Sequence, residues 1–144
     1  MLVKQILDSK PSSEVLTIDS TSRLSQAAQL LSSMGVGALV VSADGKTPDG
    51  ILSERDIVRE IGRNGSGVLA GQVANAMSEN VVCCRPDDTA DNVLSMMTER
   101  RFRHMPVVDS GRMIGLISIG DVVKARLDEL NLERDALEGM ITGH

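Results

Sequence analysis

The sequence predicts an α+β fold built from two copies of one unit. The stretch GILSERD at residues 50–56 reappears as GLISIGD at residues 115–121, and both read Gly, two apolar residues, Ser, two variable residues, Asp. A second match, at an offset of 66, aligns the segment starting at Val15 with the one starting at Val81. Because a half of about 47 residues is too small to bury a good core alone, we expect two halves that pack sheet to sheet about an approximate twofold axis.

The repeats divide the chain into five parts. We place the first repeat at residues 15–61, a linker at 62–80 and the second repeat at 81–126. An N-terminal segment, 1–14, precedes them, and a C-terminal tail, 127–144, follows.

Each repeat is expected to read strand, helix, strand, strand, helix. In the first repeat, a β-rich run at 15–18 precedes a cluster of N-cap residues, DSTS. A helix follows, because Leu24, Ala27, Ala28, Leu31 and Met34 are spaced along one helical face. GALVV and GILS then predict two strands, and ERDIVREI predicts the closing helix.

The second repeat follows the same order. Its expected elements are a strand at Val81–Cys84, a helix whose face carries Ala90, Val93, Leu94 and Met97, the strands HMPVVD and GLIS, and the helix GDVVKARL. The linker is expected to hold a short helix around residues 72–77.

Composition excludes several classes of protein. The net charge of −5 disfavours broad nucleic-acid binding, and one Phe with no Trp or Tyr offers no platform for stacking bases. No apolar run approaches the ~18 residues that span a bilayer, and the opening stretch lacks the features of a secretory signal. We therefore expect a cytoplasmic protein without a membrane anchor.

The repeated heptad has two interpretations. Ser53 with Asp56, and Ser118 with Asp121, are spaced as the N-cap and N3 residues of a helix capping box. A helix N-terminus after a strand also presents free N–H groups, a hydroxyl and a carboxylate in one place. That set matches the 2′,3′-diol of a ribose, so both a helix cap and a ribose site remain open.

A phosphate would have to bind elsewhere, because Asp repels it. The only dense basic cluster, RRFRH at residues 100–104, offers Arg101, Arg103 and His104 for that purpose. The alternative is a solvated basic loop.

Cys83 and Cys84 are the only cysteines. Adjacent cysteines bridge only with strain, and without a nearby His they make a poor zinc site. We interpret them as small strand residues in a reducing compartment, with a redox switch as the alternative.

The duplicated units, the two heptads and the stretch RHMPVVD together resemble a tandem pair of CBS (cystathionine β-synthase) domains. The stretches SERDIVR, PDDT, RFRHMPVVD and SIGDVVK are similar to free-standing bacterial CBS-pair proteins that carry no attached enzyme. The resemblance covers residues 1 to about 126.

The resemblance implies two β-α-β-β-α repeats whose clefts bind adenosyl ligands such as AMP, ADP, ATP, NAD or S-adenosylmethionine. One implied cleft combines Ser118 and Asp121 with Thr17, Ile18, Gly37 and Ala38, and the other combines Ser53, Arg55 and Asp56 with Cys83, Cys84 and Met105. Arg103 and His104 are the implied phosphate contacts, with Arg101 and Pro106 beside them. The stretch GVGALVV lacks the basic pair and the Pro of RHMPVV, so the clefts should be unequal, and the one with Thr17 and Asp121 is favoured.

The resemblance implies a regulatory nucleotide sensor with no catalytic cofactor or metal, which signals to an unknown protein partner by changing shape or affinity. Since no nucleophile arrangement stands out, we do not expect an enzyme. A homodimer is expected because Leu127, Leu130, Leu137 and Ile141 follow near-helical spacing in the tail. The alternatives are a structural dimer with vestigial pockets and a thiol redox sensor using Cys83 and Cys84.

Overall fold

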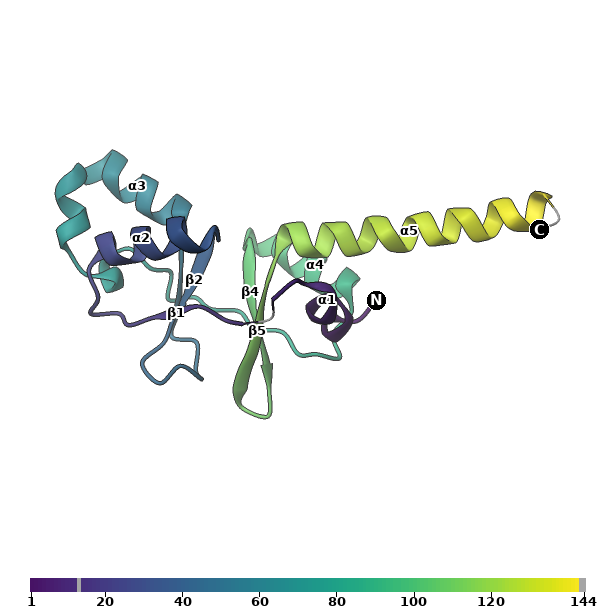
Figure 1. Ribbon diagram of the computed structural model, residues 1–144, viewed down its shortest axis with the longest axis horizontal. Helices are drawn as coiled ribbons and strands as arrows, with labels where there is room; N and C mark the ends of the chain where they lie inside the picture. Colours follow the sequence, from purple (N-terminus) through teal and green to yellow (C-terminus); the bar gives the residue numbers. More distant parts are fainter. Residues whose placement is uncertain (13, 143–144) are drawn as a thin grey trace.

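The computed structural model describes residues 1–12 and 14–142 and confirms the α+β fold with two repeats (Figure 1). The first repeat contains β1 (Thr17–Ile18), α2 (Leu24–Met34), β2 (Ala38–Val41), β3 (Gly50–Ser53) and α3 (Glu54–Asn64). The second contains α4 (Ala90–Arg100), β4 (His104–Asp109), β5 (Arg112–Ser118) and α5 (Ile119–Thr142). The last two residues of the expected tail lie outside the described residues.

Two short 3₁₀ helices connect the repeats, η1 (Ser66–Ala70) and η2 (Val73–Asn75). The second lies within the stretch expected to form a short helix. Its Val73 is fully buried and its N–H donates to the carbonyl of Ser22, which ties the linker to the first repeat.

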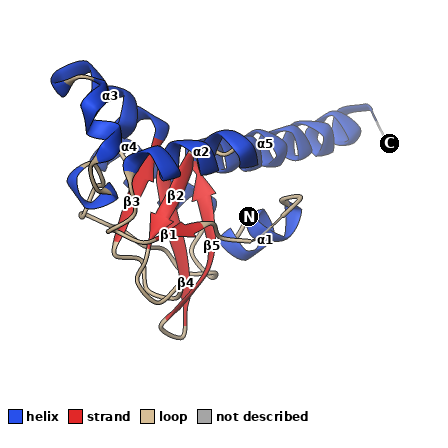
Figure 2. Ribbon diagram, turned by 60° about the vertical axis from the view of Figure 1, so that its left-hand side comes forward, coloured by secondary structure: helices blue, strands red, loops and turns tan. Residues whose placement is uncertain are grey.

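The strands form two small sheets at the centre of the molecule, with helices outside them (Figure 2). In the first sheet β1 runs parallel to β2, and β2 runs antiparallel to β3. In the second sheet β4 and β5 form an antiparallel hairpin in which Met105 faces Ile117. Each sheet covers its own apolar cluster, so each repeat has a separate core.

The strand expected at Val81–Cys84 is wrong: only Cys84 pairs with β4, in a single parallel bridge to Val107. The reason is a missing donor. In the first repeat the N–H of Val40 donates to the carbonyl of Leu16. The equivalent position in β4 is Pro106, which has no N–H, so the ladder stops after one bridge.

Residues near the N-terminus form a helix, α1 (Val3–Ser9), that belongs spatially to the second repeat. Val3, Ile6 and Leu7 are buried in the core that also holds Cys84 and Ile117. The N–H of Val3 donates to the carbonyl of Asp88, which fixes the start of α1 beside α4. The chain then crosses to the first repeat to form β1.

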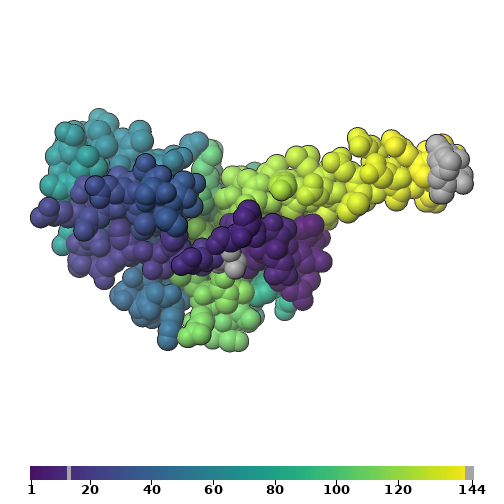
Figure 3. Space-filling view, viewed as in Figure 1, coloured from purple at the N-terminus to yellow at the C-terminus, as the bar shows by residue number. Residues whose placement is uncertain are grey.

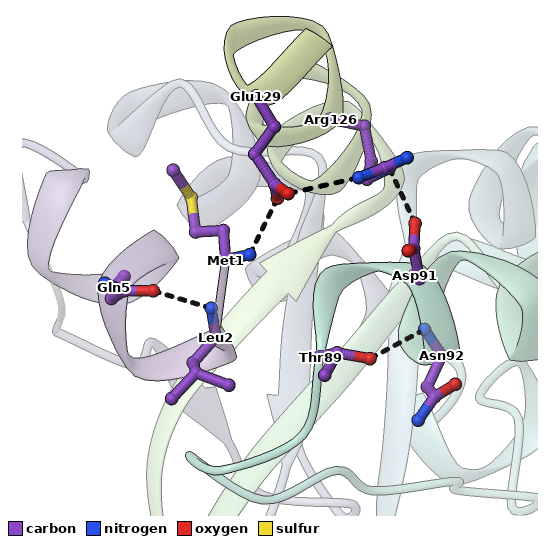
Figure 4. Close-up of polar contacts among 8 residues, drawn as sticks. All are labelled: Met1, Leu2, Gln5, Thr89, Asp91, Asn92, Arg126 and Glu129. Carbon is purple, nitrogen blue, oxygen red and sulfur yellow. Dashed lines mark hydrogen bonds and ion pairs between the residues drawn. The ribbon is translucent and has the colours of Figure 1, made fainter. Parts of the chain in front are cut away.

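Ion pairs hold the first turns of α5 to the body of the molecule (Figure 4). Arg126 pairs with Asp91 of α4 at 2.6 Å, and the carboxylate of Glu129 forms an ion pair with the amino group of Met1 at 2.9 Å. Beyond Glu129, α5 continues as a projecting arm (Figures 1 and 3). This arm exposes apolar side chains, namely Leu130, Leu132, Leu137, Met140 and Ile141.

Candidate functional site

Both heptads form the helix caps that their spacing predicts. At the start of α5, the N–H of Ser118 donates to Oδ2 of Asp121 at 2.9 Å, and the N–H of Asp121 donates to Oγ of Ser118 at 3.1 Å. At the start of α3, Ser53 and Asp56 make the same reciprocal pair at 2.8 and 3.3 Å. The two carboxylates are therefore fixed at equivalent places, and their remaining contacts decide what each can bind.

Asp121 lies in a cleft of about 440 Å³, which we name the Asp121 cleft. It brings together Ser118 and Asp121 from the second repeat with Gly37 and Ala38 from the first, as the resemblance implies. The full lining is Lys10, Ser12, Glu14, Val15, Leu16, Met34, Gly35, Val36, Gly37, Ala38, Leu116, Ser118 and Asp121. Thr17 and Ile18, which form β1 directly after the lining residue Leu16, do not line the cleft.

Lys10 is the residue of this cleft that the sequence did not reveal. Its ammonium donates to Oδ2 of Asp121 at 3.0 Å and to the carbonyl of Leu116 at 2.8 Å. Within the part of the chain that the structure describes, both hydrogen bonds that Asp121 accepts, from Ser118 and from Lys10, engage Oδ2. Oδ1 is thus the oxygen available to an incoming donor such as a ribose hydroxyl.

The electrostatics of the cleft favour an ionised Asp121. Burial by itself would raise the pKa of this carboxyl, but the N–H of Ser118 and the Lys10 ammonium outweigh burial and lower the pKa. The carboxylate is therefore charged at neutral pH, as a strong acceptor of hydrogen bonds must be.

Asp56 lies in a much smaller hollow of about 70 Å³, which also includes Ser53, Phe102 and His104. Oδ2 of Asp56 accepts from Ser53, and Oδ1 accepts from the guanidinium of Arg59 at 2.7 Å. Both oxygens are engaged, so this carboxylate has less capacity for a diol than Asp121 does. Arg55 lies exposed in the first turn of α3, outside the hollow.

The structure does not bring Cys83 and Cys84 to Asp56. They line a different hollow of about 780 Å³, the cysteine hollow, together with Thr47, Arg85, Ser110 and other residues of the loops between strands. Burial raises the pKa of the exposed Cys83, and burial with the nearby charge of Asp88 raises the pKa of the buried Cys84 to about 12. Neither thiol has the lowered pKa of a reactive cysteine.

The residues around the start of β4 lie at different depths. Arg101 and Arg103 are exposed, whereas Met105 and Pro106 are buried in the strand. Half-buried His104 borders both sites: it lines the Asp56 hollow, and its Nε2 is 3.8 Å from the position that a Cβ on Gly37 would occupy. Burial, with the charges of Lys10 and Arg103, lowers the pKa of His104 despite the opposing effect of Asp121 and Glu54.

The chain also offers no metal site or membrane span over the residues that the structure describes. Across 1–12 and 14–142, no group of three or more His, Cys, Asp or Glu side chains is arranged to hold a metal ion. Within the same ranges, none of the helices combines the length and apolarity needed to cross a membrane.

Comparison with protein-family models places CBS domains at residues 3–63 and 70–128. The chain is 37% identical over 112 residues to the CBS domain-containing protein CBSX3 of Arabidopsis thaliana, described as mitochondrial. This match covers 75% of the chain and 54% of that relative, so the chain corresponds to about half of the relative's length.

Solved structures agree with this match. The crystal structure of the CBS-domain containing protein ATU1752 from Agrobacterium tumefaciens superposes with a TM-score of 0.82 at 43% identity, covering 88% of this chain and 99% of that one. The CBS domain pair of protein MJ0100, solved in complex with methylthioadenosine and S-adenosyl-L-methionine, gives a TM-score of 0.76 at 25% identity over 87% of this chain and 98% of that one.

Proposed function

Since the chain belongs to the family of CBS-domain proteins, we propose that it is a regulatory module that binds an adenosyl ligand in the Asp121 cleft. Binding would alter the shape of the module or its affinity for a protein partner. The observation that carries the proposal is the available Oδ1 of an ionised Asp121 in a cleft of about 440 Å³ formed by both repeats. A ligand held there contacts both halves at once and so couples its binding to their relative position.

The chemistry of the cleft fits a nucleoside. Asp121 would accept hydrogen bonds from the ribose diol. Val15, Leu16 and Val36, with the small Gly37 and Ala38, line the cleft and would give the base apolar contacts. The adenosyl compounds named for the MJ0100 domain pair support this class of ligand.

The Asp121 cleft is the stronger of the two candidate sites. Its volume of about 440 Å³ falls in the range of small-molecule sites, whereas the Asp56 hollow of about 70 Å³ does not. Arg59 also occupies the oxygen of Asp56 that corresponds to the available oxygen of Asp121. We propose that ligand binds first and most tightly beside Asp121.

The proposed site is tested by calorimetry with AMP, ATP, NAD and S-adenosylmethionine, followed by NMR of the complex with the tightest binder. We expect the amides of Gly37, Ala38 and Asp121 to shift, while those of Cys83 and Gly111 in the cysteine hollow stay in place. Shifts confined to the cysteine hollow would place the site elsewhere. A folded chain that binds none of the four compounds would refute the proposed function.

We propose further that the chain forms a homodimer through α5. Leu127, Leu130, Leu137 and Ile141 follow alternating three- and four-residue steps, with Arg134 at the remaining position of the stripe. The stripe is exposed, by 56% at Leu127 and 84% at Ile141, on a helix that projects from the body.

A second copy in antiparallel orientation fits this stripe. If the two α5 helices cross at the level of Leu132, Leu127 faces Leu137 of the second copy, and Arg134 faces Leu130 and not another Arg134. Leu132 itself points away from the stripe. Light scattering should therefore show a dimer at micromolar concentration. Leu137→Glu should weaken the dimer at least about tenfold, whereas Leu132→Glu, on the opposite side of α5, should not. A monomeric wild type would refute the arrangement.

We propose that the chain regulates and does not catalyse a reaction, since the Asp121 cleft offers a helix cap, an ion pair with Lys10 and apolar side chains that fit a bound nucleoside. The alternative of a thiol sensor receives no support from the raised pKa values of Cys83 and Cys84. Both cysteines are free thiols, which fits the cytoplasmic location that we propose.

A further inference from the structure

Lys10 is held at the Asp121 cleft by a rigid support. It directly follows α1, whose Val3, Ile6 and Leu7 are buried in the core of the second repeat. Leu7 packs so closely on β5 that a Cβ on Gly115 would lie 2.6 Å from its Cδ2. The backbone of Lys10 is therefore fixed against β5, and only its flexible side chain extends along the strand to Asp121.

The ammonium of Lys10 has one donor left after its contacts with the described residues. An ammonium carries three N–H donors, and those of Lys10 reach Leu116 and Asp121 in two hydrogen bonds. The side chain of Lys10 is 27% exposed, so its charge is partly withdrawn from water and acts more strongly on a group inside the cleft. The third donor can meet a ligand atom without breaking either existing contact.

We propose that Lys10 selects adenosyl ligands by the charge of the group on the 5′ carbon of the ribose. The inference rests on the proposed function, since it presumes that Asp121 holds the ribose diol. With the diol on Asp121, the 5′ substituent of the same ribose lies within reach of the flexible Lys10 side chain. An anionic 5′ group, as in AMP, gains a charged hydrogen bond, a neutral one gains nothing, and a cationic sulfonium is repelled.

Asp121 is the charge that opposes this order, but in the bound state its free Oδ1 is covered by the ribose diol, whereas the third donor of Lys10 is left for the 5′ group. Arg103 lies beside the start of α5, where its carbonyl accepts from the N–H of Ile119, but its side chain is exposed, so solvent screens its charge. Glu14 also lines the cleft, but it is exposed, so water and salt screen its charge. Lys10 is the cation that both lines the cleft and touches Asp121.

The test measures the affinities of AMP, adenosine and S-adenosylmethionine by calorimetry for wild type, Lys10→Met and Lys4→Met. Methionine keeps most of the length of the lysine stem and removes its charge. Lys4 is the matched control, because it lies on α1 and pairs only loosely with Asp87, at 3.8 Å. Thermal unfolding of each variant checks that the fold is kept.

We expect wild type to bind AMP about tenfold to a hundredfold more tightly than adenosine, and S-adenosylmethionine most weakly. In Lys10→Met the ratio of AMP to adenosine affinity should fall towards one, while adenosine binding stays close to wild type, because Lys10 engages Oδ2 of Asp121 and the diol uses Oδ1. Lys4→Met should keep the wild-type ratio.

Three results would overturn the inference: a ratio that is unchanged in Lys10→Met, an equal fall in AMP and adenosine binding in that variant, or a wild type that prefers the cationic ligand. In each of these cases wild type still binds an adenosyl compound, and the proposed function stands. If wild type binds none of the three, the proposed function fails and this inference fails with it.

Discussion

Replacing Asp121 with Asn separates helix capping from ligand binding. The amide oxygen of Asn can still accept from the N–H of Ser118, so the cap is kept. The charge of Asp121 is lost, and with it the ion pair to Lys10. In wild type the Lys10 side chain is 27% exposed and that of Asp121 is 25% exposed. Partly exposed pairs of this kind contribute about 0.3–1 kcal/mol, so the melting temperature without ligand should fall by only about 1–4 °C.

The effect on binding should be much larger. With the amide oxygen turned towards Ser118, the amide nitrogen of the substituted side chain stands where Oδ1 of Asp121 was. A donor then faces the ribose hydroxyls, and the net loss corresponds to one hydrogen bond to a charged acceptor, about 1.5–3 kcal/mol. Adenosyl affinity should therefore fall about tenfold to a hundredfold, and the stabilisation by saturating ligand should shrink accordingly.

Asp56→Asn is the matched control. It removes the same charge from the same cap position, and it also breaks an ion pair, with Arg59 at 2.7 Å. Its stability should fall by a similar amount, while adenosyl affinity should stay within about threefold of wild type. Scanning calorimetry and titration calorimetry on the three proteins give both quantities. Equal affinities in all three, or equal losses in both variants, would refute the assignment of the ribose to Asp121.

Acid titration, thiol labelling and a glycine substitution test other parts of the same geometry. The pKa of Asp121 is lower in the folded chain than in the unfolded chain. Ionised Asp121 therefore stabilises the fold fully above about pH 4, and this stabilisation is lost as pH falls through the lowered pKa. The difference in unfolding free energy between wild type and Asp121→Asn, measured in urea, should vanish in acid, and a constant difference would contradict this. With a pKa of about 12, buried Cys84 should resist a thiol reagent at neutral pH, while exposed Cys83 reacts. The folded chain should therefore take up one equivalent of reagent and the denatured chain two. Rapid uptake of two equivalents by the folded chain would argue against the structure. Gly115→Ala should lower the unfolding free energy by about 1–3 kcal/mol, because the added Cβ meets Leu7. Gly120→Ala should barely change it, because the nearest atom to its added Cβ is 3.6 Å away. Equal stabilities of the two variants would mean that α1 does not pack as described.

The sequence could predict the features that repeat. The heptads appear as caps at Ser53 and Ser118 because capping depends only on local spacing. The helices α2 and α4 appear because their apolar faces have helical period. The approach of Asp121 to Gly37 and Ala38 required the resemblance, since nothing local in the sequence specifies which faces of the two repeats meet.

Two features escaped the sequence for physical reasons. The position of Lys10 depends on where α1 packs. The 3₁₀ helix η2 packs on the first repeat in the equivalent way, with Val73 donating to Ser22 as Val3 donates to Asp88, but the sequence match that starts at Val15 and Val81 does not reach either segment. The strand expected to include Cys83 and Cys84 depended on hydrogen bonds from a partner strand 22 residues ahead, where Pro106 lacks the donor. Propensity at residues 81–84 could not show that the partner was incomplete.

The packing of α1 has a consequence for how the chain acquires its structure during synthesis. Its docking surface includes the start of α4, β5 and the start of α5, and the contact between Lys10 and Asp121 spans 111 positions. During synthesis α1 therefore leaves the ribosome before the elements it packs against. The apolar side chains of Val3, Ile6 and Leu7 stay exposed to solvent while the first repeat is synthesised. The apolar side chains of that repeat form a cluster of their own, so its elements can begin to pack in the meantime. We expect closure of this long loop to be a late and slow event, because it joins residues 111 positions apart, and the Asp121 cleft is complete only once Lys10 meets Asp121.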